Sequence, residues 1–338
     1  MSFSSFSSFS SFTEVAAPLP GEADLLAGVV ANLRADLPKL VYADWLEERS
    51  DPRGPFLRDF VEAMRAGTKL PPAIGSRCWN ATVGTTLARL ATVYGFAPHL
   101  DDLFALARPM LRVVTDPSDD DSIPVGATKF GGCPDLPALA GWPRVKRGPL
   151  TFLAQFDLAD IRENSLAGRL LPESGLLSFF VYHDIGEDIL GEDIGKKGRL
   201  VTLTSAKGPL VRMEFPDDLP AENQAPACEV LLREGLDLPP LEMAVRRKTL
   251  PANLELGDCE SYARLLGDLR DWGSVLLGYS HATATDDPTP GSDWLQLAAF
   301  ASDDNLNWNW RDDHTLFWHV LADDLAHGRF DRVQAADG

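Results

Sequence analysis

Cysteine and basic residues are both scarce in this sequence, and each shortage excludes a class of function. Only four cysteines occur in 338 residues, and no two of them form a CxxC pair. A zinc knuckle, a dithiol redox centre and a disulfide-stapled secreted fold are therefore not expected. The 31 lysines and arginines stand against 50 acidic residues, which gives a formal charge of −19. Such a chain is a poor ligand for nucleic-acid phosphates or an anionic membrane surface, and a basic protein or a metal ion is its more natural electrostatic partner.

Long apolar runs are missing as well. No stretch approaches the ~18 uncharged apolar residues that span a bilayer, so we expect no membrane segment. The N-terminus repeats Phe3, Phe6, Phe9 and Phe12 between serine pairs, without the cationic and continuous apolar regions of a signal peptide. We predict that residues 1–20 form a disordered tail in a cytoplasmic protein. The phenylalanines are either contacts for a partner groove or the product of repeat expansion.

Helical spacing of apolar residues is clearest between residues 21 and 66. One stripe covers residues 25–33, a second helix is predicted over 39–49, and a third over 55–65 after the Asp51-Pro-Arg-Gly54 turn. We interpret 21–66 as a three-helix module. Residues 67–110 are predicted to be a linker followed by helices at about 79–94 and 100–110.

The remainder, residues 111–338, has short β-like runs separated by glycine and proline. The clearest strands are 150–156, 175–182, 200–204, 294–300 and 315–321, with helices at 157–165, 259–272 and 322–328. Strands that come in runs predict an α+β fold with a mostly antiparallel sheet. Leu153, Ala154 and Phe156 also align with Leu297, Ala298 and Phe300. A pseudo-duplicated sheet is therefore a hypothesis.

Two segments carry family resemblances. The string LVYADWLEER (40–49), followed by DPRG (51–54) and FLR (56–58), resembles the planctomycete repeat-companion domain over residues 21–65. The strings TKFGGCPDLP (128–137), PLTFLAQ (149–155), LPESGLLSFF (171–180) and LLGY (276–279) resemble the YwqG-like family, a domain of unknown function, over residues 105–335. The first resemblance implies an accessory module. The second implies an α+β fold in a bacterial, non-secreted protein and makes an immunity or protein-binding role plausible.

The best candidate for a ligand loop follows residue 128. Paired glycines let backbone N–H groups converge on an anion, and a neighbouring lysine adds charge. The alternative is a tight turn in which the glycines pass close under a tryptophan. The residues of this candidate site are Lys129, Gly131, Gly132, Asp135, Trp142 and Gln155.

Catalytic and metal patterns are absent from the sequence. There is no GxSxG elbow and no SxxK motif, and His314 and His319 are five apart, a spacing that defeats local chelation. A long-range site of His183, Asp184, His319 and Asp323 is conceivable if the sheet is duplicated. We predict no catalytic residue, no metal and no cofactor.

Charge and tryptophan both concentrate near the C-terminus. Residues 286–338 hold eleven aspartates, no glutamate and three arginines, together with four of the eight tryptophans. An acidic face with aromatic residues suits a basic protein partner, whereas tryptophans that fill the core are the alternative. The predicted contact residues are Asp303, Asp304, Trp308, Trp310, Asp312, Asp313 and Trp318.

We therefore expect a protein-binding module, of which an immunity-type protein that binds a basic toxin is one form. The alternative is an enzyme or a small-ligand-binding protein with a cleft near the residues 129–135, Trp142 and Gln155. The sequence leaves the oligomeric state open.

Overall fold

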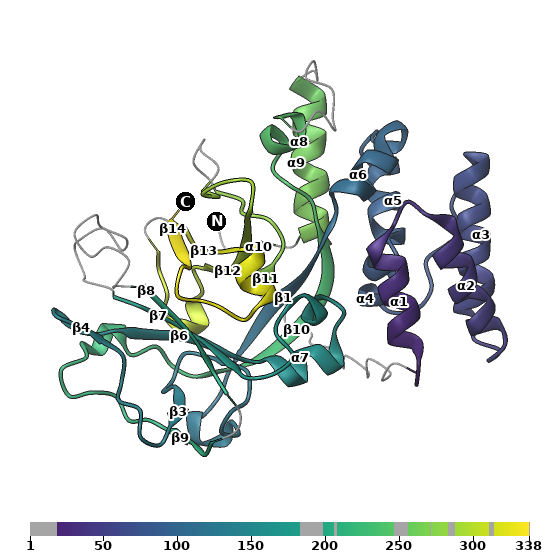
Figure 1. Ribbon diagram of the computed structural model, residues 1–338. Coiled ribbons are helices and arrows are strands. Elements are labelled where there is room, and N and C mark those ends of the chain that lie inside the picture. Colours follow the sequence, from purple (N-terminus) through teal and green to yellow (C-terminus); the bar gives the residue numbers. More distant parts are fainter. Residues whose placement is uncertain are drawn as a thin grey trace, which may run out of the picture.

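The computed structural model describes residues 19–182, 199–205, 208–246, 256–270, 272–282, 288–310 and 314–337. A helical N-terminal region precedes one large antiparallel sheet, which curls almost into a barrel (Figure 1). The predicted α+β class, with a small helical module before a mostly antiparallel sheet, is confirmed. None of the helices in these ranges is long and apolar enough to cross a membrane.

The helices before the sheet follow the predicted order. They are α1 (Glu22–Ala31), α2 (Asp36–Glu47), α3 (Arg53–Ala66), α4 (Arg77–Thr82), α5 (Thr85–Val93) and α6 (Leu100–Leu106). The single helix predicted over 79–94 was wrong, because Gly84 separates α4 from α5 with a left-handed φ of 82°. A Cβ at Gly84 would lie 2.9 Å from the ring of Phe104, so glycine also permits α6 to pack closely there.

The main sheet has ten strands in the order β14-β13-β12-β11-β1-β10-β2-β6-β7-β8. Their bounds are β1 (Arg108–Pro117), β2 (Lys129–Phe130), β6 (Thr151–Asp157), β7 (Leu176–Val181), β8 (Arg199–Thr204), β10 (Cys228–Asp237), β11 (Val275–Leu277), β12 (Trp294–Ala301), β13 (Thr315–Leu321) and β14 (Gln334–Asp337). The five predicted strands correspond to β6, β7, β8, β12 and β13. The central strands β1 and β10 were not predicted.

Smaller elements complete this part of the chain. Two-stranded ladders pair β3 (Asp135–Pro137) with β9 (Leu210–Arg212) and β4 (Arg144–Val145) with β5 (Gly148–Pro149). The helices are α7 (Leu158–Asn164), α8 (Leu241–Arg246), α9 (Leu256–Arg270) and α10 (Ala322–Ala326). The predicted helices at 157–165, 259–272 and 322–328 correspond to α7, α9 and α10.

The sheet consists of two halves with the same strand order. The first half is β2-β6-β7-β8 and the second half is β11-β12-β13-β14, on either side of the central pair β1 and β10. Each half has a bulge at the same place, between Phe152 and Ala154 in β6 and between Gln296 and Ala298 in β12. The sequence alignment of these two strands is therefore confirmed by their pairing register.

Both halves contribute to one aromatic core. The rings of Phe179 and Phe300 lie 5.2 Å apart, those of Phe179 and Trp318 5.6 Å apart, and those of Phe130 and Trp308 5.8 Å apart. Ring pairs at these separations add to the stabilisation that burial alone gives. This shared core holds the two halves against each other.

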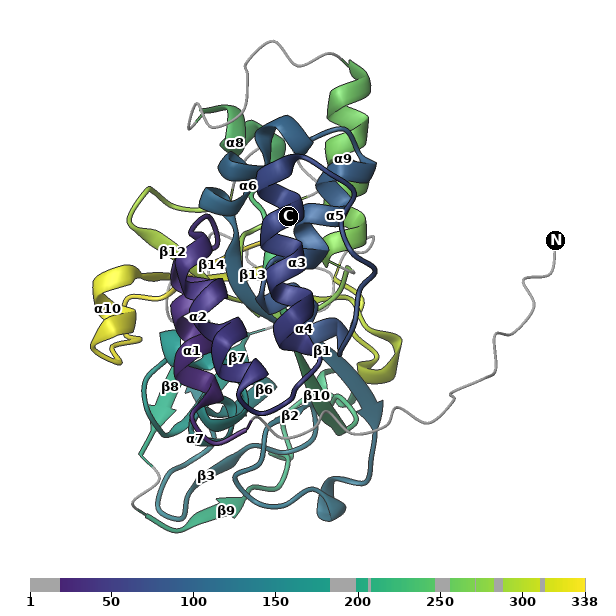
Figure 2. The same ribbon diagram turned by 90° about the vertical axis from the view of Figure 1, so that its right-hand side faces the viewer.

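A second core joins the helical region to α9 and the end of β10 (Figure 2). The ring of Phe96, after α5, lies 5.6 Å from that of Tyr262 in α9. The hydroxyl of Tyr94 donates to Asp268 Oδ2 at 2.5 Å. The helices before the sheet thus pack on a helix that precedes β11.

Buried polar contacts also cross the boundary that we predicted at residue 66. The Tyr42 hydroxyl donates to the carboxylate of Glu22 and accepts a bond of 3.0 Å from Trp79 Nε1 in α4. Arg53 Nη1 lies 2.7 Å from the same carboxylate. The three predicted helices and α4 therefore belong to one packed unit.

Candidate ligand-binding site

Three residues of the predicted ligand site, Lys129, Asp135 and Gln155, are fully buried and form hydrogen bonds within the protein. Lys129 donates to Asp120, and Asp135 accepts from Arg212 Nε at 2.9 Å and from Gln155 Nε2 at 2.6 Å. Burial opposes the charge of Asp135, but the bonds from Arg212, a backbone N–H and Gln155 hold its pKa below the usual value. Burial lowers the pKa of Lys129. These groups form an internal ion-pair cluster, and not the cleft that the alternative hypothesis placed here.

The glycines of that loop make a tight turn. Gly131 and Gly132 have left-handed φ values of 61° and 65°, and a Cβ on Gly132 would lie 2.7 Å from the carboxylate of Asp120. Trp142 lies in a separate apolar cluster, where its Nε1 donates to the Leu150 carbonyl at 2.7 Å. The structure contains the tight turn that we weighed as the alternative, but its glycines pass close to Pro226 and Asp120 and not under Trp142.

The tryptophans of the predicted acidic face lie in the core. Trp308, Trp310 and Trp318 are 6%, 3% and 1% exposed. They belong to the cluster that both halves of the sheet share. The prediction that these side chains present a contact surface is corrected, because burial in the aromatic core leaves almost none of their area for a partner.

The aspartates of that face are placed differently. Asp304 is exposed, whereas Asp303 is half-buried and accepts a bond of 2.8 Å from the Thr115 hydroxyl. Asp303 also caps the short 3-10 turn that follows it. Asp312 and Asp313 lie outside the described residues. A face built from these acids would therefore depend on Asp304 and on residues whose positions are not described.

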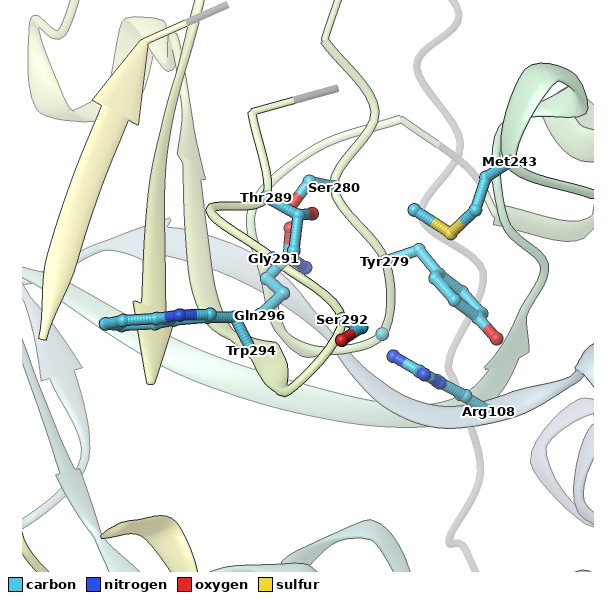
Figure 3. Close-up of a pocket in the computed structure, with 10 residues that line it drawn as sticks. Arg108, Met243, Tyr279, Ser280, Thr289, Gly291, Ser292, Trp294 and Gln296 are labelled. Carbon is cyan, nitrogen blue, oxygen red and sulfur yellow. The ribbon is translucent and has the colours of Figure 1, made fainter. Parts of the chain in front are cut away.

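A polar cavity that the sequence did not predict lies in the second half of the sheet, where β10 and β11 end (Figure 3). Its volume is about 280 Å³, close to the lower end of small-ligand pockets. The lining residues are Arg108, Met243, Gly278, Tyr279, Ser280, Thr289, Gly291, Ser292, Trp294 and Gln296. These lining residues, all in the described ranges, include an arginine but no carboxylate. The polar cavity therefore differs in charge from the acidic protein around it.

The backbone turn after β11 brings the chain to the cavity. Leu277 and Gly278 both have left-handed φ, 67° and 84°. Leucine rarely adopts this conformation, which costs about 1–2 kcal/mol. A Cβ on Gly278 would lie 2.7 Å from Asp237 Oδ2, so only glycine permits the chain to pass the carboxylate this closely. The turn repeats the Gly131-Gly132 turn of the first half.

Asp237 holds the segment after this turn. It is fully buried and accepts bonds from the Tyr279 backbone N–H at 2.8 Å, from Arg270 Nη1 at 2.7 Å and from His281 Nε2 at 3.2 Å. Burial opposes its charge, but Arg270 and His281 hold the pKa of Asp237 below the usual value. The segment that lines the cavity is thus fixed from behind by a charged network.

Two polar pairs form the wall nearest to β12 and β13. Ser280 Oγ lies 2.8 Å from His319 Nε2, and both residues are buried. Gln296 donates from Nε2 to the Leu277 carbonyl at 2.6 Å. Its Oε1 has no hydrogen-bond partner within the described part of the chain, although Gln296 is only 3% exposed. The cavity therefore contains a buried acceptor that none of the described residues satisfies.

Arg108 supplies the cation of the cavity. Its guanidinium lies 4.2 Å from the centre of the Tyr279 ring, and the Tyr279 hydroxyl donates to the Leu106 carbonyl at 2.6 Å. Figure 3 shows Arg108 next to Tyr279 and Gln296 near Ser280. Stacking on a ring that is itself fixed restrains the arginine at this position.

The first half has apolar side chains where the cavity has polar ones. Gln296 pairs with His319, and at the equivalent register Phe152 pairs with Phe180. The two phenylalanine rings lie 5.4 Å apart within a buried apolar cluster. The fold therefore does not require a glutamine and a histidine at this position of the sheet.

Sequence patterns contained only partial signals for this cavity. The LLGY segment (276–279) was recognised for its family resemblance, but its role as a left-handed turn was not. His319 was considered for a metal site with His183 and Asp184, both outside the described residues. Ser280, Gln296 and Asp237 come from three separate segments, and no spacing rule links them. Only the fold brings them together.

The fold and the cavity define a class: an α+β protein whose two-half antiparallel sheet has a polar pocket in one half. A family described as "Domain of unknown function (DUF1963)" matches residues 128–336, more than half of the chain. The chain belongs to this family. No curated protein matches it. The match includes most of the cavity lining, while Arg108 and β1 precede it.

Proposed function

We propose that the protein binds a small polar molecule in the polar cavity. The observation that carries the proposal is the Oε1 atom of Gln296, a buried acceptor without a partner in the described residues. Leaving such an atom unsatisfied costs about 1–3 kcal/mol. A hydrogen-bond donor on a ligand would recover this free energy on binding.

The first half of the sheet supports the same proposal. Its Phe152 and Phe180 show that apolar packing is compatible with this position of the fold. Retaining Gln296 and His319 in the second half therefore adds polarity that folding does not need. Buried polar groups in a concave site are typical of ligand recognition.

The test is a screen of polar metabolites by saturation-transfer NMR against two variants. Ser292→Trp fills the cavity from an exposed lining residue, and Ser122→Trp is the matched control at an exposed serine elsewhere. We expect compounds that bind wild type and the control but not Ser292→Trp. Binding that is equal in all three proteins would place the ligand elsewhere, and a screen without any such compound would contradict the proposal.

A second candidate function is acyl transfer, favoured by the 2.8 Å contact between Ser280 Oγ and His319 Nε2. A serine next to a histidine has the geometry of a nucleophile and its base. A fluorophosphonate probe tests this candidate. Labelling of Ser280 in wild type, lost in Ser280→Ala and retained in Ser292→Ala, would support it. Labelling no greater than that of the heat-denatured protein would exclude it.

We also propose a finer family assignment for two parts of the chain, and a protein partner. The helices over 22–66 are proposed to be the repeat-companion module, and the sheet a YwqG-like domain.

Capture of a basic protein remains a prediction supported by the acidity of residues 286–338. With three tryptophans buried, that contact would rely on exposed aspartates such as Asp304. Charge reversal of Asp304 should then abolish capture from native lysate.

A further inference from the structure

We infer that the ligand of the polar cavity is a small organic carboxylate that also carries an N–H or O–H donor. The inference rests on the proposed function and names its ligand class. Two side chains define that class: the guanidinium of Arg108 and the amide oxygen of Gln296. Neither the N–H groups of the guanidinium nor the amide oxygen has a hydrogen-bond partner among the described residues.

Arg108 is suited to an anion. Other arginines in the described ranges, such as Arg53, Arg212 and Arg270, each form an ion pair with a carboxylate. Arg108 is half-buried, and its side chain makes the cation–π contact with Tyr279 but no ion pair or hydrogen bond within the described residues. A guanidinium has five N–H donors in a planar fork that matches a carboxylate.

The acidic residue directly across the strand pair does not compete for Arg108. Asp237 is its cross-strand neighbour in the β1–β10 ladder. Both carboxylate oxygens of Asp237 are already bonded, to Arg270, to a backbone N–H and to His281. Within the described part of the chain, no carboxylate therefore competes with an anion that enters the cavity for this guanidinium.

Gln296 specifies a donor on the ligand. Its Nε2 is bonded to the Leu277 carbonyl, which can only accept, so the amide cannot turn to present its N–H groups. Oε1 can only accept. A ligand that lacks an N–H or O–H group at this place would leave the buried oxygen unsatisfied.

Size and charge favour a carboxylate over a phosphate. The cavity has a single cation among its described lining residues and a volume of about 280 Å³. A phosphate carries more charge and is usually held by several donors or a helix N-terminus. Met243, Tyr279 and Trp294 supply apolar walls for the carbon skeleton of a small organic acid.

Three matched probes test the class on the wild-type protein. N-acetylglycine has both the carboxylate and the N–H group, N-acetylsarcosine lacks the N–H group, and N-acetylglycine methyl ester lacks the charge. The readout is the ¹³C-methyl signal of Met243, which lines the cavity, with Met64 and Met213 as internal controls. We expect N-acetylglycine to shift the Met243 signal and to bind about tenfold or more tightly than either analogue.

Two arginine variants assign the charge dependence. Arg108→Gln should abolish the preference for the acid over its ester. Arg49→Gln is the matched control and should retain the preference for the acid. Arg49 also stacks on a ring, that of Trp45 at 3.9 Å, but it follows α2 and does not line the cavity. The comparison of probes on wild type does not depend on whether either variant folds.

The outcomes separate this inference from the proposed function. Equal binding of N-acetylglycine and its ester, or no shift of Met243 with N-acetylglycine at millimolar concentration, overturns the ligand class. If neutral polar compounds from the screen bind wild type and Ser292→Trp abolishes their binding, the proposed function survives. If no small molecule binds in the cavity, both the proposed function and the ligand class fail.

Discussion

The two halves of the sheet have the same strand order and the same bulge, but they distribute polarity in opposite ways. In the first half, Lys129 and Gln155 are polar while Phe152 is apolar. In the second half, the residues at the equivalent register of Lys129 and Gln155 are Val275 and Ala299, and the residue equivalent to Phe152 is Gln296. The same strand arrangement therefore holds a hydrogen-bonded ion-pair cluster in one half. In the other half it holds a polar cavity with an amide oxygen that no described residue bonds.

For this pair of glutamines, hydrogen-bond satisfaction and not polarity alone separates the structural cluster from the candidate site. Gln155 uses its amide oxygen and nitrogen on Asp135 and the Ala127 carbonyl. Gln296 bonds to the described residues through its amide nitrogen alone. Substitutions at matched positions of the two halves should separate these roles.

The largest expected effect is at the two aspartates that pair with a buried cation. Asp237→Asn should lower the free energy of unfolding by about 3–5 kcal/mol, because Arg270 remains charged and buried without its partner. Asp120→Asn should cost less, about 1–3 kcal/mol, since Lys129 can lose its proton. Urea unfolding measures both.

The pH dependence of the stability lost in Asp120→Asn and Asp237→Asn serves as a control for this comparison. Raising the pH should reduce the cost of Asp120→Asn, because the pKa of Lys129 is already lowered by burial and the lysine becomes neutral. The cost of Asp237→Asn should not fall in this way, since arginine does not deprotonate. An equal cost for both variants at every pH would contradict the distinction.

The two glutamines should respond unequally to leucine. Gln155→Leu removes three hydrogen bonds around Asp135 and should cost about 2–4 kcal/mol. Gln296→Leu removes one bond but also an unsatisfied oxygen, so we expect about 1 kcal/mol or less. Thermal and urea unfolding of the ligand-free proteins measure the difference. A larger loss for Gln296→Leu would mean that this residue serves the fold.

The left-handed turns offer a smaller comparison. Gly278→Ala should cost about 1–3 kcal/mol, because its Cβ would meet the fixed carboxylate of Asp237 and the backbone φ is positive. Gly132→Ala should cost somewhat less, since Asp120 is partly exposed and can move. Gly141→Ala is the control, because nothing lies within 4 Å of its Cβ. Similar unfolding midpoints for all three would argue against the close approach.

The smallest expected effect is in acid. The pKa values of Asp135 and Asp237 are both lowered in the folded protein. Such groups stabilise the fold above their unfolded pKa of about 3.9, and this stability is lost as the pH falls toward the folded pKa. Asp135→Asn should reduce the slope of stability against pH below about pH 4 by at most ~1.4 kcal/mol per unit. An unchanged slope would show that Asp135 does not contribute.

Much of the fold could be predicted from local patterns. The strands β6 and β12 have long apolar runs, and α2 and α3 have clear helical periodicity, so their positions followed from the sequence. The central strand β10 was missed because Glu229, Arg233 and Glu234 interrupt its apolar residues. Both of its neighbours in the sheet are distant in sequence, and no local pattern reveals them.

The candidate site was less predictable, for a physical reason. Paired glycines and a lysine at 129–132 indicated an anion loop, but the sequence could not show that Asp120 accepts bonds from Lys129 and from the backbone N–H of Cys133. The acidic C-terminal region suggested a surface for its tryptophans, whereas the sheet curls so that they fill the core. Whether a polar atom has a partner is a property of the folded chain.

The most direct test of the account is the Met243 methyl signal on addition of N-acetylglycine, in wild type and in Gln296→Leu. We predict a saturable shift in wild type and affinity at least about fivefold weaker in Gln296→Leu, with unfolding free energies that differ little. Equal affinity in the two proteins, or no shift in wild type, would contradict the claim that the second half retains its polar groups for a ligand.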